Sequence, residues 1–180
     1  MKGDIILDIL KINLTKYNNP KVRIPIIITI LIGFSVIFSQ FTVDDAFITF
    51  RYGKNLIENG IWNWNHSGNL VEAYTNFSYA VLSIIPHYFK ISPLIFIKSF
   101  SLFLAFLILM RIEKSNISDS NKLLAELFLF LNPYTYIHLY SGLETPLFIF
   151  LIFEGAMRLL GDDKSEKTPV AYFILLLLPL

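Results

Sequence analysis

Long apolar runs separated by short polar stretches make up most of this chain. A helix needs about twenty mainly apolar residues to cross a bilayer, so the pattern predicts an all-α, polytopic transmembrane protein with about five or six spans. Residues 24–41 form transmembrane span 1. The later apolar runs are Phe77–Phe89, Ser92–Met110, Leu123–Tyr140, Pro146–Leu160 and Pro169–Leu180.

Composition agrees with this prediction and excludes several classes of protein. Hydrophobic residues make up 54% of the chain and charged residues only 16%, whereas soluble domains carry about 25% charged residues. The net charge of +1 argues against a nucleic-acid binder that neutralises phosphates. The absence of cysteine excludes disulfides, thiolate metal sites and a cysteine nucleophile.

The distribution of basic residues predicts the topology. Residues 1–23 are rich in lysine, and apolar residues recur at helical spacing over residues 4–15, so this segment is predicted to be a cytoplasmic amphipathic N-terminus. Residues 42–75 then form an extracytoplasmic loop, and residues 76–180 contribute the further transmembrane helices. The protein is therefore predicted to be a multi-pass protein of the plasma membrane.

Two topologies stay open for residues 77–110: two spans, or one span with a short interfacial or re-entrant helix. Basic residues at Arg111 and Lys122 favour a cytoplasmic loop after this region and hence the second alternative. Under that alternative Glu144 lies outside the cell, on the same side as Asp44.

The final apolar segment, Ile174–Leu180, continues to the last residue of the chain. Spans normally end in polar or charged anchors. The sequence is therefore predicted to be the N-terminal portion of a longer protein, truncated at its C-terminus.

The polar loop after span 1 opens with two adjacent aspartates, Asp44 and Asp45. Thr42 and Asp45 have the spacing of a capping box, and Gly60 is a typical C-terminal stop. These signals predict an amphipathic helix over Val43–Asn59 that lies along the membrane surface.

Two explanations for the aspartates remain open. Acids in the first turn of a helix stabilise its positive end by about 0.3–1 kcal/mol each. Alternatively, one carboxylate is a general base, and the second raises its pKa or helps to hold a divalent cation. Arg51, near a carboxylate and at headgroup height, is a candidate bidentate ligand for a phosphate.

Aromatic residues and charge pairs around this loop allow further predictions. Trp62 and Trp64 are either interfacial anchors or rings that stack on a sugar. His66 has no second histidine near it, so no metal ligand is predicted there. Ion pairs at i,i+4 spacing are predicted for Lys54 with Glu58, Lys122 with Glu126, and Glu154 with Arg158.

Three motifs carry a resemblance to a known family. The first is Asp44-Asp45-Ala46-Phe47-Ile48-Thr49-Phe50-Arg51-Tyr52, the second is Trp64-Asn65 followed by Glu72-Ala73-Tyr74-Thr75-Asn76, and the third is Ser141-Gly142-Leu143-Glu144-Thr145. In this order they resemble the N-terminal portion of GT-C superfamily membrane glycosyltransferases, most closely the group of the mycobacterial terminal arabinofuranosyltransferase. Ala73 replaces a glycine and Leu143 a methionine of that group, and a later Arg-Pro-Glu-Gly motif is missing.

The resemblance implies a function in glycan biosynthesis at the cell envelope. The donor would be a polyprenyl-phosphate-linked sugar in the membrane, and the acceptor an extracytoplasmic glycan or lipid-linked acceptor. Asp44 would be the base with Asp45 assisting, and Arg51 would bind the donor phosphate. No cofactor besides the donor is implied with certainty, and a divalent cation stays open. The implied contacts to sugar or acceptor are Glu72, Tyr74, Asn76 and Glu144.

The alternative is a non-catalytic membrane protein, either a degenerate glycosyltransferase remnant or a transporter-like fragment. Transporters place ionisable residues inside their spans, and Glu126 and Glu154 are the candidates here. Pairing at i,i+4 with Lys122 and Arg158, or snorkelling, explains both glutamates without transport.

Overall fold

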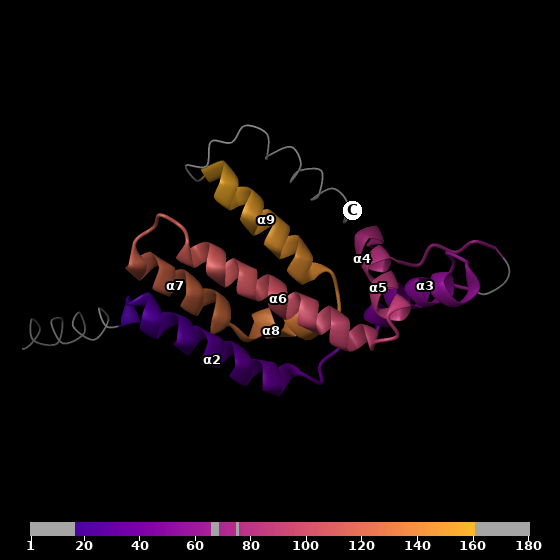
Figure 1. Cartoon of the computed structure of the whole chain (residues 1–180), viewed down its shortest axis with the longest axis horizontal. Coiled ribbons are helices and arrows are strands. Elements are labelled where there is room, and N and C mark those ends of the chain that lie inside the picture. The colour runs from indigo at the N-terminus through magenta and orange to yellow at the C-terminus, as the bar shows by residue number, and fades with distance from the viewer. Residues whose placement is uncertain (1–16, 66–68, 75, 161–180) are drawn as a thin grey trace, which may run out of the picture. The chain divides into compact units, whose positions relative to one another are not determined.

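The computed structural model describes residues 17–65, 69–74 and 76–160, and all regular secondary structure within them is helical (Figure 1). The predicted all-α class is therefore confirmed for this part of the chain. The predicted amphipathic segment 4–15, His66 and the last apolar run, residues 169–180, lie outside the described residues. The helices are α2 (Pro20–Phe38), α3 (Asp45–Asn59), α4 (Phe77–Leu82), α5 (Ile84–Tyr88), α6 (Pro93–Glu113), α7 (Asp119–Phe130), α8 (Pro133–Tyr140) and α9 (Thr145–Leu160).

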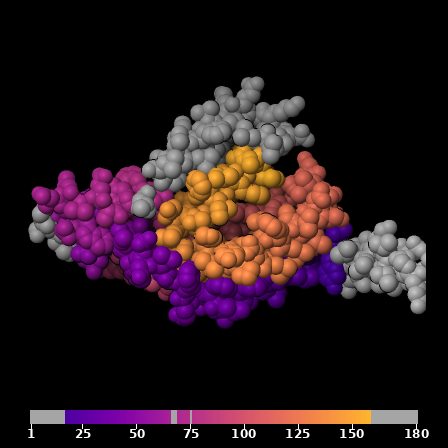
Figure 2. Space-filling view, turned by 180° about the vertical axis from the view of Figure 1, so that it is seen from behind, coloured from indigo at the N-terminus to yellow at the C-terminus, as the bar shows by residue number. Residues whose placement is uncertain are grey.

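Two helices, α2 and α6, are long and apolar enough to cross a membrane. The pair of α8 with residues 145–158 of α9, bent by 117°, makes a third candidate if it is one span. On α2 the side chains of Val36 and Ile37 are 71% and 72% exposed, as expected for a surface that faces lipid rather than water. Helix α9, visible in Figure 2 (yellow), also carries exposed Phe148 and Ile152. The structure is thus consistent with a membrane protein.

The predicted number of about five or six spans is not confirmed among the described residues, because two of the apolar runs are interrupted. The run Phe77–Phe89 is divided at Ser83 into α4 and α5. The run Leu123–Tyr140 is divided before Pro133, where the Asn132 side chain accepts a hydrogen bond from Tyr134 N at 3.1 Å. Proline at the first position starts a new helix instead of continuing the old one.

The chain separates into two compact units. The first comprises residues 1–39 and 109–136, and within it α2 packs on α7. The second comprises residues 40–108 and 137–180, and within it α3, α4 and α5 pack together (Figure 1).

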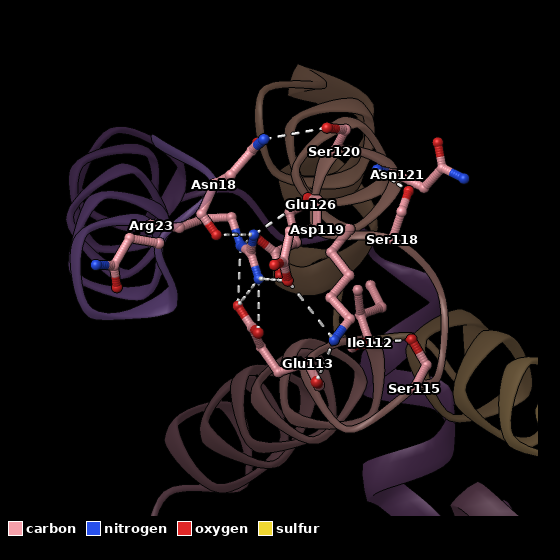
Figure 3. Close-up of polar contacts among 12 residues, drawn as sticks. Asn18, Arg23, Ile112, Glu113, Ser115, Ser118, Asp119, Ser120, Asn121 and Glu126 are labelled. Atoms are coloured by element: carbon pink, nitrogen blue, oxygen red, sulfur yellow. Dashed lines mark hydrogen bonds and ion pairs between the residues drawn. The ribbon is translucent and has the colours of Figure 1, made fainter. Parts of the chain in front are cut away.

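A buried ion cluster connects the helices of the first unit (Figure 3). The Arg23 side chain is 1% exposed and its Nη2 lies 2.7 Å from Glu113 Oε2. Its Nε lies 3.1 Å from Oε2 of the fully buried Glu126. The predicted pair of Glu126 with Lys122 is wrong, because Lys122 Nζ instead donates to the backbone oxygen of Glu113 at 2.9 Å. The i,i+4 pair of Glu154 with Arg158 is confirmed at 2.7 Å.

The second unit has an apolar core at the crossing of α3 and α4. Its buried members are Ala46, Phe50, Tyr79 and Ile97. Close approach at this crossing depends on Gly53, where an added Cβ would lie 2.3 Å from Ser83 Oγ and 2.7 Å from the Ser83 backbone. Glycine therefore fixes how near α3 comes to the α4–α5 junction.

The substitution Gly53→Ala is expected to destabilise the protein by about 1–3 kcal/mol, since the Ser83 backbone cannot move without displacing α4 and α5. Gly33→Ala is the matched control, because it is also helical and an added Cβ there meets nothing within 4 Å. The control should be neutral or stabilising by about 0.5–1 kcal/mol. Thermal unfolding in detergent compares the two variants, and equal melting temperatures would contradict the predicted clash.

Candidate active site

Helix α3 starts at Asp45, two residues later than predicted, and Asp44 is its N-cap. The capping box is wrong, because Thr42 Oγ1 donates to Phe41 O rather than serving the helix. Val43 precedes the helix, and its backbone N–H donates a hydrogen bond to Ser141 O at 2.9 Å. This tertiary hydrogen bond ties the residue before the helix to the Ser141 turn.

Both aspartates are exposed at this helix start. The Asp44 side chain makes no capping hydrogen bond to α3. Asp45 lies in the first turn, where the helix dipole favours a negative charge. Within the described part of the chain, neither carboxylate has a hydrogen bond or ion pair to another side chain, so both are open to a ligand.

The turn Ser141–Glu144 packs directly against the start of α3. Gly142 has a φ of 83°, and a Cβ on it would lie 2.8 Å from the Ala46 Cβ. Leu143 packs on the core formed by Ala46 and Phe50. The first and third sequence motifs, far apart along the chain, therefore form one junction within the second unit.

Tyr79 lies beneath this junction and was not singled out by its sequence context. It is 1% exposed and belongs to the same core as Ala46. Burial raises the pKa of the Tyr79 phenol, and the negative charge of Glu144 raises it further. The phenol therefore stays neutral, and Glu144 lies close enough for its charge to act on it.

The loop between α3 and α4 is folded around Tyr52. The Tyr52 hydroxyl accepts a hydrogen bond from Ala73 N at 2.7 Å and donates one to Val71 O. The Tyr74 ring meets the Tyr52 ring edge-on at 4.7 Å between centroids. Trp62 joins the cluster, 5.9 Å from Tyr74. Tyr74 is therefore held in a cluster of rings and is half-exposed.

The remaining predicted site residues have different surroundings. Glu72 is exposed on the loop. Asn76 is buried, and its side chain accepts a hydrogen bond from Tyr79 N at 2.8 Å as the N-cap of α4. The Arg51 guanidinium lies 4.3 Å from the centroid of the Trp64 ring. Within the described residues no ion pair joins Arg51 to Asp44 or Asp45, and its role as a phosphate ligand stays a prediction.

The described part of the chain contains no group of three or more histidine, cysteine, aspartate or glutamate side chains that could hold a metal ion. A divalent cation near Asp44 and Asp45 stays a prediction.

Helical content and apolar spans place the described chain in the class of all-α proteins that carry membrane-type helices. No protein-family model, no curated protein and no solved structure matches it.

Proposed function

We propose that this protein is a GT-C-type membrane glycosyltransferase that transfers a sugar from a polyprenyl-phosphate donor to an extracytoplasmic glycan or lipid-linked acceptor. One observation carries the proposal. The motif at Asp44–Ala46 and the motif at Ser141–Glu144 meet through the 2.9 Å bond from Val43 N to Ser141 O and the contact of Gly142 with Ala46. Motifs that share a function are expected to converge in space.

The proposed reaction needs few groups. Asp44 removes the proton from an acceptor hydroxyl, whose oxygen then bonds to the anomeric carbon of the sugar. The bond from that carbon to the phosphate oxygen breaks, and the polyprenyl phosphate leaves with the electron pair. Asp45, one residue away, assists Asp44 in positioning the acceptor hydroxyl. Phosphate is a good leaving group, so the mechanism relies mainly on positioning.

Binding groups are proposed from the same junction and the adjacent loop. Glu72, Tyr74 and Glu144 contact the sugar or the acceptor, and half-exposed Tyr74 is suited to stack on a sugar face. Asn76 acts through the backbone that it caps. Arg51, whose guanidinium carbon lies 4.3 Å from the Trp64 ring centroid, binds the donor phosphate.

A transfer assay tests this function. The purified chain in detergent is given radiolabelled sugars on polyprenyl phosphate together with cell-envelope glycan acceptors. We expect incorporation of label into the acceptor, and none from the corresponding nucleotide sugars. Failure of every polyprenyl-phosphate donor, with a preparation whose helicity by circular dichroism is intact, would contradict the proposal.

A further inference from the structure

A pocket of about 510 Å³ is lined by residues of α3, α5 and the start of α6. Neither Asp44 nor Asp45 lines it. Its polar lining is formed by Arg51, Lys54, Asn55, Glu58, His87 and Ser92. Its apolar lining is formed by Phe47, Phe50, Pro93 and Leu94. The pocket thus combines a basic side with an apolar wall.

The two cations on the pocket are both available to a ligand. Arg51 is exposed, and its guanidinium carbon lies 4.3 Å from the centroid of the Trp64 ring. This cation–π contact involves the charge of the guanidinium, and its N–H groups can donate to an anion. Lys54 is 53% exposed and lies 3.8 Å from Glu58, which is 55% exposed. Such an exposed pair is weak and exchanges readily for a stronger anion.

His87 adds a polar atom that the fold leaves without a partner. Within the described part of the chain, His87 Nε2 is buried and has no hydrogen-bond partner. Burial lowers the pKa of His87, and the positive charge of Lys54 lowers it further. A hydrogen bond to the Phe50 backbone and the negative charge of Glu58 act in the opposite direction. Buried polar atoms without hydrogen-bond partners are costly. An oxygen-rich ligand in this pocket would supply the partner that His87 Nε2 lacks.

The apolar wall distinguishes the ligand from a free anion. Phe47 is 50% exposed although it lies on a pocket wall. Pro93 and Leu94 continue this wall at the first turn of α6, one of the two membrane-type helices. A hydrocarbon chain attached to the anion would cover these side chains, whereas a soluble anion would leave them exposed to water.

We infer that this pocket binds the phosphate headgroup of a membrane lipid, with Arg51 and Lys54 on the phosphate, His87 Nε2 hydrogen-bonded to one of the phosphate oxygens, and the lipid chain against Phe47 and Leu94. Two lipids share this chemistry: a glycerophospholipid of the bilayer, and a polyprenyl phosphate. Arg51 is also the proposed ligand of the donor phosphate, so the polyprenyl-phosphate alternative rests on the proposed function, whereas lipid binding itself is measured without transferase activity.

Native mass spectrometry of the full chain in detergent tests the inference. The probes are phosphatidic acid, a polyprenyl phosphate, phosphatidylcholine with the same acyl chains as the phosphatidic acid, and inorganic phosphate. We expect adducts with one or both phosphate lipids at concentrations where phosphatidylcholine and inorganic phosphate give none. Preference for phosphatidic acid identifies a bilayer phospholipid as the source, and preference for polyprenyl phosphate identifies the isoprenoid lipid.

Variants locate the binding within the pocket. Arg51→Gln and Lys54→Gln are each expected to weaken the phosphate-lipid affinity about tenfold or more, as for loss of a hydrogen bond to a charged group. His87→Gln should weaken it less, because glutamine can still donate. Lys114→Gln, at an exposed lysine that does not line the pocket, is the matched control and should bind like the unmodified chain.

Three results would overturn the inference: equal binding of phosphatidylcholine, equal binding of inorganic phosphate, or unchanged affinity in both Arg51→Gln and Lys54→Gln. The outcome is distinguishable from that of the transfer assay. A chain that binds phosphate lipids without transferring sugar supports the pocket and contradicts the proposed function. The reverse result contradicts the pocket alone.

Discussion

Replacing Asp44 by asparagine is expected to lower the rate of sugar transfer about 10²- to 10⁴-fold, the usual contribution of a general base. Asparagine keeps the shape of the side chain and loses only the ability to accept a proton. The structure makes this a clean test, because Asp44 is exposed and makes no capping hydrogen bond. Asparagine is also an equally good N-cap residue, so stability should change by less than about 0.5 kcal/mol. Initial rates with a polyprenyl-phosphate sugar donor give the measurement.

Two further variants separate catalysis from helix electrostatics. Asp45→Asn removes a first-turn charge from the same helix and should reduce transfer less than Asp44→Asn does. Asp119→Asn removes an exposed first-turn charge from α7 and should leave the rate unchanged. Normal turnover in both Asp44→Asn and Asp45→Asn, with normal melting temperatures, would show that the aspartates serve only the helix dipole.

Replacing Arg23 by methionine is expected to destabilise the first unit by about 3–5 kcal/mol, because one side of a buried ion cluster is removed. Methionine fills similar volume but leaves Glu113 and Glu126 without their cation. It also removes the bonds from Arg23 Nη1 to the backbone oxygens of Asn18 and Asp119, at 3.0 and 3.2 Å. Unfolding by SDS in mixed micelles, followed by circular dichroism, measures the loss.

A double variant and a control make the Arg23 prediction specific. Adding Glu126→Gln to Arg23→Met removes one uncompensated buried charge, so it should restore about 0.5–3 kcal/mol, the usual range for coupled neighbours. Lys21→Met removes an exposed cation from the same first turn of α2 and should change stability by less than about 0.5 kcal/mol. Equal effects of Arg23→Met and Lys21→Met would show that the ion cluster contributes nothing.

Sequence alone determined the features that depend on neighbouring residues. The apolar runs predicted an all-helical chain, and the first of them corresponds to α2. Gly60 was predicted to end α3 and does so with a φ of 68°, a conformation that glycine adopts without strain. The Lys54–Glu58 and Glu154–Arg158 pairs follow from one helical turn of separation. Each of these depends on contacts within a few residues of the chain.

Only the tertiary structure decided which distant groups meet. Local spacing assigned Thr42 and Asp45 to a capping box. In the structure, the segment before α3 is instead held by a hydrogen bond from Val43 N–H to the distant Ser141 O. Local spacing also predicted an ion pair of Glu126 with Lys122. Because α7 packs on α2, Glu126 instead forms an ion pair with Arg23. Tyr79 and His87 had no distinguishing pattern, and their surroundings come entirely from other helices. Partner choice depends on which segments pack together, and that is a property of the whole fold that residue spacing does not encode.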